Sequence, residues 1–183
     1  TATIAYADSQ TVVGGFSELT TNLYAQWRAD TLTVTYEGNG GTSPSGGTTS
    51  TNTGETLTTL ATTSRTGYTF NGWFTATSGG SQITTSAPHG QTASFTLYAQ
   101  WTANTLNITY DSRSGSAASG GDATTTTGAT ISTLATTSRT GYTFNGWFTA
   151  TSGGSQITTS APHGQTASFT LYAQWTANTL NIT

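Results

Sequence analysis

The sequence predicts a mainly β protein, α+β at most, that is built from small domains repeated in tandem. The string Leu-Tyr-Ala-Gln-Trp ends at Trp27, Trp101 and Trp175, so the copies recur with a constant period of 74. Residues 59–109 are identical to residues 133–183. Apolar residues alternate with β-branched polar residues within each copy, which is typical of half-buried strands. We therefore expect one compact β unit for each period along the chain.

The period divides the chain into four parts. Residues 1–30 match the C-terminal part of a diverged repeat, residues 31–104 and 105–178 are full repeats, and residues 179–183 start a further repeat. Both ends fall inside a repeat, and the first residue is not Met, so we expect this chain to be a window from a longer array. Each unit is small for an independent core and should gain stability from its neighbours.

The connection between the two full repeats is short. The strand expected to end at Trp101 is followed by Thr102-Ala103-Asn104, and the next strand begins at Thr105. Three residues without Gly or Pro leave little freedom. This predicts neighbouring units held at a nearly fixed angle, in a semi-rigid rod.

Three strands are expected in each full repeat. Residues 31–36 place Leu32, Val34 and Tyr36 on one face, and residues 105–110 repeat the pattern. Residues 94–101 form the second strand and residues 67–74 the third. In the third, Asn71-Gly72 could be a two-residue hairpin turn or a bulge within one strand, and the short flanks favour the bulge.

The segments between these strands carry weaker signals. Residues 38–54 are rich in Gly, Ser and Thr and predict a long turn that could include an edge strand. In residues 56–65, the spacing of Leu57 and Leu60 permits one helical turn, although threonine is a poor helix former. Residues 75–92 are expected to be a loop anchored by Ile83.

The composition excludes several classes of protein. The chain has 48 Thr and 20 Ser, about 37% of its residues, but only 6% charged residues and a net charge of −3. Four arginines and no lysine cannot supply the basic surface of a nucleic-acid binder. No apolar run approaches the roughly 18 residues that a spanning helix needs, so we expect no membrane span in this window. Absent cysteine excludes disulfides and thiolate metal sites. This composition is typical of extracellular or cell-surface proteins.

Recurring polar chemistry is sparse, so we expect no enzyme, no catalytic residue, no cofactor and no metal. Glu55 has Ala129 at the equivalent position, and one recurring acid per unit is not a carboxylate pair. His89 and His163 recur in a Pro-His-Gly turn without a second ligand at metal-binding spacing. We expect them to be solvent-exposed turn residues.

Two kinds of side chain leave a functional alternative open. Arg65 and Arg139 could contact an anion, but stacking on a neighbouring aromatic ring or pairing with a backbone carbonyl is favoured. Trp73 and Trp147 could contact a ligand as sugar-stacking platforms. A place in the core is favoured for them, as it is for Trp101.

The motif Arg-Thr-Gly-Tyr-Thr-Phe-x-Gly-Trp-Phe at residues 65–74, followed by Leu-Tyr-Ala-Gln-Trp at residues 97–101, resembles the Listeria–Bacteroides repeat family of internalin B-repeat-like domains. The resemblance covers both full repeats and implies a β-grasp-like fold, tandem occurrence in long bacterial surface or secreted proteins, and a role in stalks or adhesion. Where the family motif commonly ends in Ala-Lys-Trp, this chain has Ala-Gln-Trp. The residues that carry the motif are Arg65, Gly67, Tyr68, Phe70, Gly72, Trp73, Leu97, Tyr98, Trp101, Arg139, Gly141, Tyr142, Phe144, Gly146, Trp147, Leu171, Tyr172 and Trp175.

Three functions are consistent with these observations. The main hypothesis is a non-enzymatic extracellular structural repeat, a stalk or fibre segment whose partners are neighbouring repeats of the same chain. The second is an adhesive or carbohydrate-binding module that presents exposed aromatic rings to a glycan or host surface. The third is lateral self-assembly into filaments with other copies, because uncharged strand edges are poorly protected against pairing.

Overall fold

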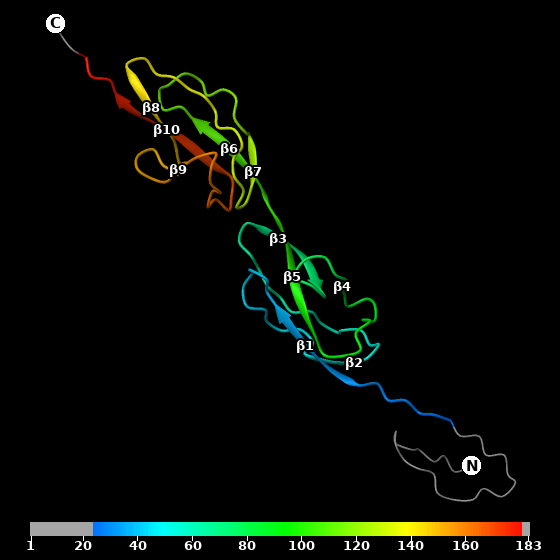
Figure 1. Cartoon of the computed structure of the whole chain (residues 1–183). Helices are drawn as coiled ribbons and strands as arrows, with labels where there is room; N and C mark the ends of the chain where they lie inside the picture. The colour runs from blue at the N-terminus through cyan, green and yellow to red at the C-terminus, as the bar shows by residue number, and fades with distance from the viewer. Residues whose placement is uncertain (1–23, 181–183) are drawn as a thin grey trace, which may run out of the picture.

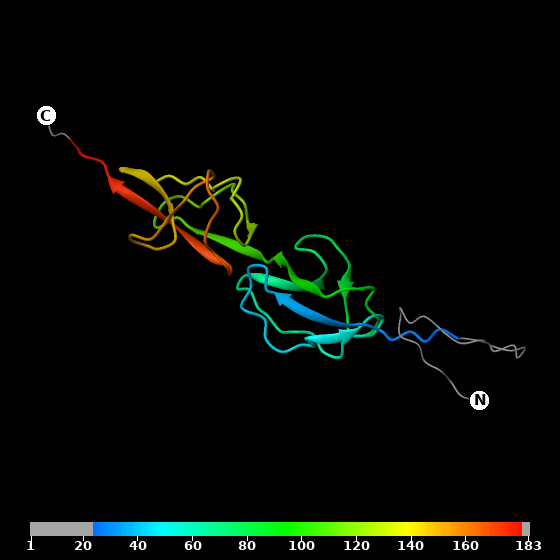
Figure 2. The same ribbon diagram turned by 60° about the horizontal axis from the view of Figure 1, so that its bottom comes forward.

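The computed structural model describes residues 24–180, which form two five-stranded sheets arranged end to end along an elongated molecule (Figures 1 and 2). No helix occurs among these residues, so the prediction of a mainly β protein is confirmed. Most of the diverged repeat expected at residues 1–30, and most of the repeat expected to start at residue 179, lie outside the described residues.

Each sheet is built from one of the two full repeats. The strands of the first repeat are β1 (Thr31–Glu37), β2 (Ser50–Asn52), β3 (Tyr68–Phe74), β4 (Gln82–Ile83) and β5 (Phe95–Ala103). Those of the second are β6 (Thr105–Asp111), β7 (Thr124–Thr126), β8 (Tyr142–Phe148), β9 (Gln156–Ile157) and β10 (Phe169–Ala177).

The two sheets have the same mixed topology. The strand orders are β2-β1-β5-β3-β4 and β7-β6-β10-β8-β9. The first and last strands of each repeat, β1 with β5 and β6 with β10, run parallel, and all other neighbours are antiparallel. The last strand is therefore the centre of its sheet, and in the first repeat it also leads directly to the next repeat.

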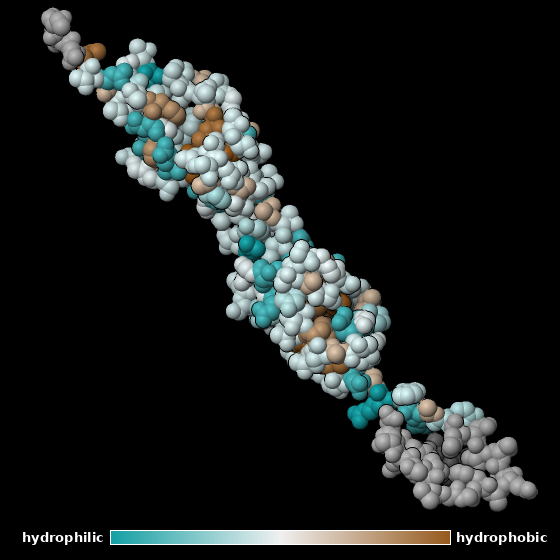
Figure 3. Space-filling model, viewed as in Figure 1, coloured by the Kyte–Doolittle hydropathy of each residue, from teal (hydrophilic) through white to brown (hydrophobic). Residues whose placement is uncertain are grey.

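One face of each sheet carries the core. Leu32 and Val34 alternate with exposed threonines on β1, as their period of two predicts. Trp73, Leu97 and Leu57 are at most 1% exposed and close the core of the first repeat. The face shown in Figure 3 has mostly near-neutral hydropathy, with small and separate apolar areas. Hydroxyl-rich sequence thus covers two small cores.

The helical turn that the spacing of Leu57 and Leu60 permits does not form in residues 56–65. This segment runs extended beside residues 42–48, with hydrogen bonds from Thr48 N to Thr59 O and from Thr42 N to Ser64 O. Its backbone groups therefore bond across the chain, and the β-branched threonines favour that conformation. Leu57 still reaches the core because it packs over the sheet from this extended segment.

The predicted bulge in the third strand is confirmed. The register between β3 and β5 shifts between Phe70 and Gly72, which leaves Asn71 unpaired in the ladder. Gly72 has a φ of 128°, a conformation that disfavours residues with a side chain. The extra residue turns the next side chain, Trp73, onto the core face.

Candidate functional site

The joint between the two repeats is a single residue, Asn104. Its N–H donates to Gly67 O of the first repeat at 2.9 Å, and its carbonyl accepts the N–H of Thr127 of the second at 3.0 Å. Its side-chain oxygen accepts the Thr69 hydroxyl at 2.7 Å. Because β5 continues to Ala103, two strands follow one another along the long axis with one residue between them (Figure 1). The joint is shorter than the three residues that the sequence predicts.

The two repeats also bury surface against each other at this joint. Gly67 and Tyr68 are half-buried there, whereas their identical counterparts Gly141 and Tyr142, at the other end of the second repeat, are exposed. Thr127 is only 7% exposed. A Cβ on Gly67 would stand 2.7 Å from Thr127 Cγ2, so the first repeat has room only for glycine here. The joint is therefore a packed interface.

The motif arginines stack on tyrosine rings, as the favoured alternative predicts. The Arg65 guanidinium lies 3.8 Å from the centre of the Tyr68 ring, and that of Arg139 lies 3.7 Å from the centre of the Tyr142 ring. Both tyrosines follow a glycine with φ near 80°. The stacked pair therefore sits at a fixed turn at the start of the third strand of each repeat.

The proposed ligand contact at Trp73 and Trp147 does not fit the structure. Each indole is 1% exposed, and its ring N–H donates to a buried backbone carbonyl, that of Ala61 at 2.8 Å or Ala135 at 2.7 Å. A sugar ring needs an open aromatic face, and the bulge has turned both faces into the core. The motif tryptophans of the third strands are therefore core residues.

The remaining motif residues support the sheet. Leu97 and Leu171 are fully buried in the cores, and Tyr98 and Tyr172 are half-buried on the same central strands. Gly146 repeats the bulge of Gly72. One motif position leaves aromatic surface exposed in both repeats, because Phe70 and Phe144 are 39% and 36% exposed and lean against the half-buried indoles of Trp101 and Trp175.

The expectation of solvent-exposed histidines is wrong. His89 and His163 are 3% and 5% exposed. The Nδ1 atom of each accepts the backbone N–H two residues ahead, and Nε2 lies 3.2 or 3.1 Å from a threonine hydroxyl of the edge strand. Each ring also leans on a phenylalanine of the central strand. The histidine thus ties its turn to the sheet, a role that the Pro-His-Gly sequence does not reveal.

This arrangement predicts that the stability of the second repeat depends on pH. Burial lowers the pKa of His163 below its usual 6.5, so the unfolded state takes up a proton before the folded state does. The free energy of unfolding should therefore be highest above about pH 6.5 and decrease as the pH falls through the folded-state pKa. Chemical unfolding between pH 7 and pH 5 measures this slope. The variant His163→Gln should have a smaller slope than the parent, and equal slopes would contradict the assignment.

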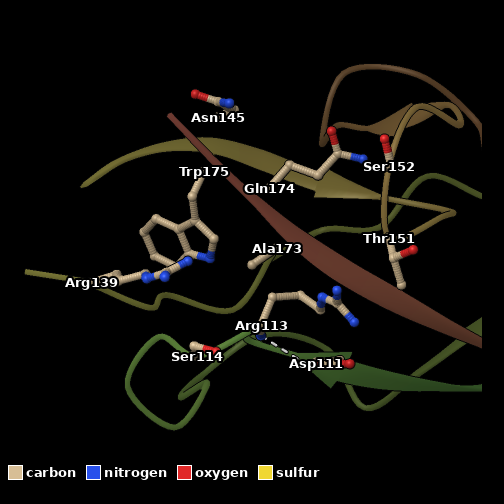
Figure 4. A pocket seen from close by; sticks show the side chains of 10 residues that line it. All are labelled: Asp111, Arg113, Ser114, Arg139, Asn145, Thr151, Ser152, Ala173, Gln174 and Trp175. Atoms are coloured by element: carbon tan, nitrogen blue, oxygen red, sulfur yellow. Dashed lines mark hydrogen bonds between the residues drawn. The ribbon is translucent and has the colours of Figure 1, made fainter. Parts of the chain in front are cut away.

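An open hollow of about 620 Å³ lies beside the third strand of the second repeat (Figure 4). Its wall includes the guanidinium groups of Arg113 and Arg139, the Asp111 carboxylate and the Trp175 indole. The Asp111 carboxylate accepts the backbone N–H of Arg113 at 2.9 Å. The indole is fixed because its N–H donates to Ser112 O at 3.0 Å.

The equivalent place in the first repeat is filled by a side chain. Asn39, which occupies the position of Arg113, donates its amide to Thr77 O at 3.0 Å and to Ala99 O at 2.9 Å. Ala99 directly follows the last residue of β5 that pairs with β1, so the amide closes that end of the parallel ladder. In the second repeat the equivalent residues are Thr151 and Ala173, and both line the hollow.

Sequence reasoning missed the hollow because it searched for features that recur. The signal was a difference between otherwise similar repeats, Glu-Gly-Asn-Gly-Gly at residues 37–41 against Asp-Ser-Arg-Ser-Gly at residues 111–115. Asn39 and Gly40 of the first repeat, whose residue types tolerate a positive φ, correspond to Arg113 and Ser114 of the second, whose residue types do not.

Two kinds of site are absent from residues 24–180. No group of three or more His, Asp or Glu side chains in this range is placed to hold a metal ion. Nor does this range contain a helix with the length and apolarity needed to cross a membrane.

Comparison with known proteins returns one family and several relatives. The profile of the Listeria-Bacteroides repeat domain matches residues 33–100 and residues 107–174. A protein of Evansella cellulosilytica named "Putative membrane protein" is 32% identical over 172 residues, 87% of this chain and 24% of the relative. Internalin H of Listeria monocytogenes is 33% identical over 115 residues, 61% of this chain and 20% of the relative. The chain thus spans about a quarter or less of the length of these relatives.

Proposed function

From the premise that this chain belongs to the Listeria-Bacteroides repeat domain family, we propose that it is a non-enzymatic structural segment of a longer bacterial protein, located outside the cell or on its surface. In this proposal the repeats form a stalk or fibre that sets the distance between whatever lies at its two ends. The resemblance to Internalin H and the hydroxyl-rich, weakly charged composition support a surface location.

The observation that carries the proposal is the packed, one-residue joint at Asn104. A flexible string of domains would have a longer linker and no buried contact between neighbours. Asn104 instead bonds to both repeats, and Thr127 is buried against Gly67. When the joints are rigid, the lengths of successive repeats add along one axis, which is the mechanical property that a stalk requires.

The joint can be tested with two matched glycine variants. Gly67→Ala should loosen the joint, because the added Cβ would stand 2.7 Å from Thr127 Cγ2 and 3.0 Å from Thr166 Cβ. Gly141→Ala is the control, since Gly141 has nearly the same φ, 78° against 80°, but nothing within 4 Å of the added atom. Both changes carry the same backbone strain, so their difference reports the contact between repeats.

Small-angle scattering and residual dipolar couplings measure the result. The parent and Gly141→Ala should give an elongated particle with one fixed orientation between repeats, and Gly67→Ala should give averaged couplings. A collapsed particle, or averaged couplings already in the parent chain, would contradict the stalk.

Lateral self-assembly into filaments is a second proposal with narrower support. The outer strands β2 and β4 have three and two residues, so each sheet edge offers few free backbone groups to another copy. Electron microscopy of the assembled protein would show whether fibres wider than one chain form. The end-to-end joint, in contrast, needs no strand edge.

A further inference from the structure

We propose that the hollow beside Arg113 is a binding site for a sugar ring that carries a carboxylate, such as a uronic acid. Of the two repeats that the structure describes, only the second has this site, and it gives the stalk a ligand-binding position in addition to its mechanical role. Four observations on the described residues support it. The end of the parallel ladder lacks the side chain that closes it in the first repeat, the backbone there is strained, the lining has an excess of positive charge, and the indole of Trp175 is held in place by a hydrogen bond.

The hollow exists because a structural side chain has been replaced. In the first repeat, the Asn39 amide closes this place with two hydrogen bonds to backbone carbonyls. The long Arg113 side chain lines the hollow instead, and within residues 24–180 its guanidinium has no hydrogen-bond partner. An arginine with free donors at the edge of a cavity is well placed to bind an anion.

The backbone around Arg113 is held in a strained conformation. Arg113 and Ser114 have φ values of 50° and 68°, in the left-handed region that residues with side chains avoid. The first repeat has Asn39 and Gly40 at these positions, with φ values of 46° and 89°, and both residue types tolerate them. Strain of this kind, kept where a relaxed alternative exists in the same chain, is a feature of functional sites.

The charge of the site favours an anion. Arg113 and Arg139 oppose a single acid, Asp111, so the wall has one net positive charge. In the first repeat, the equivalent residues Arg65 and Glu37 have opposite charges, which cancel. Arg139 stacks on Tyr142, with its guanidinium carbon 3.7 Å from the ring centre, and this contact restricts the orientations of the guanidinium. Planar guanidinium groups match the geometry of a carboxylate, with two parallel hydrogen bonds.

The size and the remaining wall favour a sugar over a bare anion. A hollow of about 620 Å³ is within the range of small-molecule sites, roughly 300–1,000 Å³, and exceeds the volume of an inorganic ion. The wall of the hollow is mostly polar, with Trp175 on one side and Thr151 and Ser152 on the other (Figure 4). A pyranose presents both an apolar face and a hydroxyl rim.

The test is a titration of the full chain with methyl β-D-glucuronide, followed by the indole N–H signals in nitrogen-15 NMR spectra. The Trp175 signal should shift and saturate, whereas that of Trp101, the equivalent residue of the first repeat, should stay in place. Methyl β-D-glucoside, which lacks the carboxylate, and sodium acetate, which lacks the ring, should each bind at least about tenfold more weakly. Equal affinity for either of them, or no shift with the glucuronide, would overturn the proposal.

Three variants assign the effect to Arg113. Arg113→Asn copies the first repeat, so it should fold and should lose the Trp175 shift. Asn39→Arg is the reciprocal change and should create a glucuronide-dependent shift of Trp101. Arg28→Asn removes the same charge from an exposed position outside both sheets and should leave binding unchanged. Binding that persists in Arg113→Asn, or that Arg28→Asn abolishes, would contradict the assignment.

Discussion

Replacing Trp73 with alanine is expected to lower the free energy of unfolding of the first repeat by about 3–5 kcal/mol. The indole is 1% exposed and contacts the Tyr36 and Phe70 rings edge-on, with ring centres 4.9 and 5.6 Å away. Its loss leaves a cavity at the centre of a small core and removes the donor to Ala61 O. A unit of this length has a total stability of about 4–11 kcal/mol, so the variant repeat should lose a large share of its stability and, at the lower end of that range, should be unfolded.

The measurement is thermal or chemical unfolding followed by the resolved NMR signals of each repeat. The second repeat should keep most of its stability, losing only what the docked joint contributes. Trp27→Ala is the matched control, because this tryptophan is 88% exposed and the same change should have little effect. A Trp73→Ala repeat that is as stable as its parent would contradict the core assignment and would return this residue to the candidates for a ligand surface.

The parts of the fold that sequence predicts are those set by local patterns. The alternation of Leu32, Val34 and Tyr36 identifies β1 and its buried face, because a strand has a period of two. Asn71-Gly72 predicts the bulge, because few other pairs provide the required backbone. The bulge in turn decides whether Trp73 faces the core, which the residue pattern alone leaves open.

The parts that sequence misses depend on distant partners. Leu57 and Leu60 have helical spacing, yet their segment bonds to residues 42–48, a contact that no local pattern encodes. In the sequence, His89 resembles an exposed turn residue. The hydroxyl that contacts its ring belongs to Thr51, 38 positions away, and no local pattern indicates that contact. The hollow at Arg113 is lined by Thr151 and Ala173, which lie 38 and 60 residues further along the chain. Their importance becomes visible only from the first repeat, where Asn39 bonds to the carbonyls of the equivalent residues.

The second large effect is a gain in stability. The double variant Arg113→Asn, Ser114→Gly should raise the free energy of unfolding of the second repeat by about 2 kcal/mol. Asparagine would restore two hydrogen bonds, to Thr151 O and Ala173 O, each with a net value of about 1 kcal/mol. Glycine would relieve the positive φ at position 114, a gain that its greater freedom in the unfolded chain partly offsets.

The reciprocal variant, Asn39→Arg with Gly40→Ser, provides the control, because it should lower the stability of the first repeat by a similar amount. Unfolding measured repeat by repeat separates the two effects, and unchanged stability in either variant would contradict the argument from the two hydrogen bonds and the positive φ. The pair also connects stability with binding. If the stabilised second repeat loses its response to the glucuronide while the strained first repeat acquires one, then Arg113 and Ser114 are retained at a cost in stability for the sake of a ligand. A stabilised second repeat that still binds would separate the strain from the site.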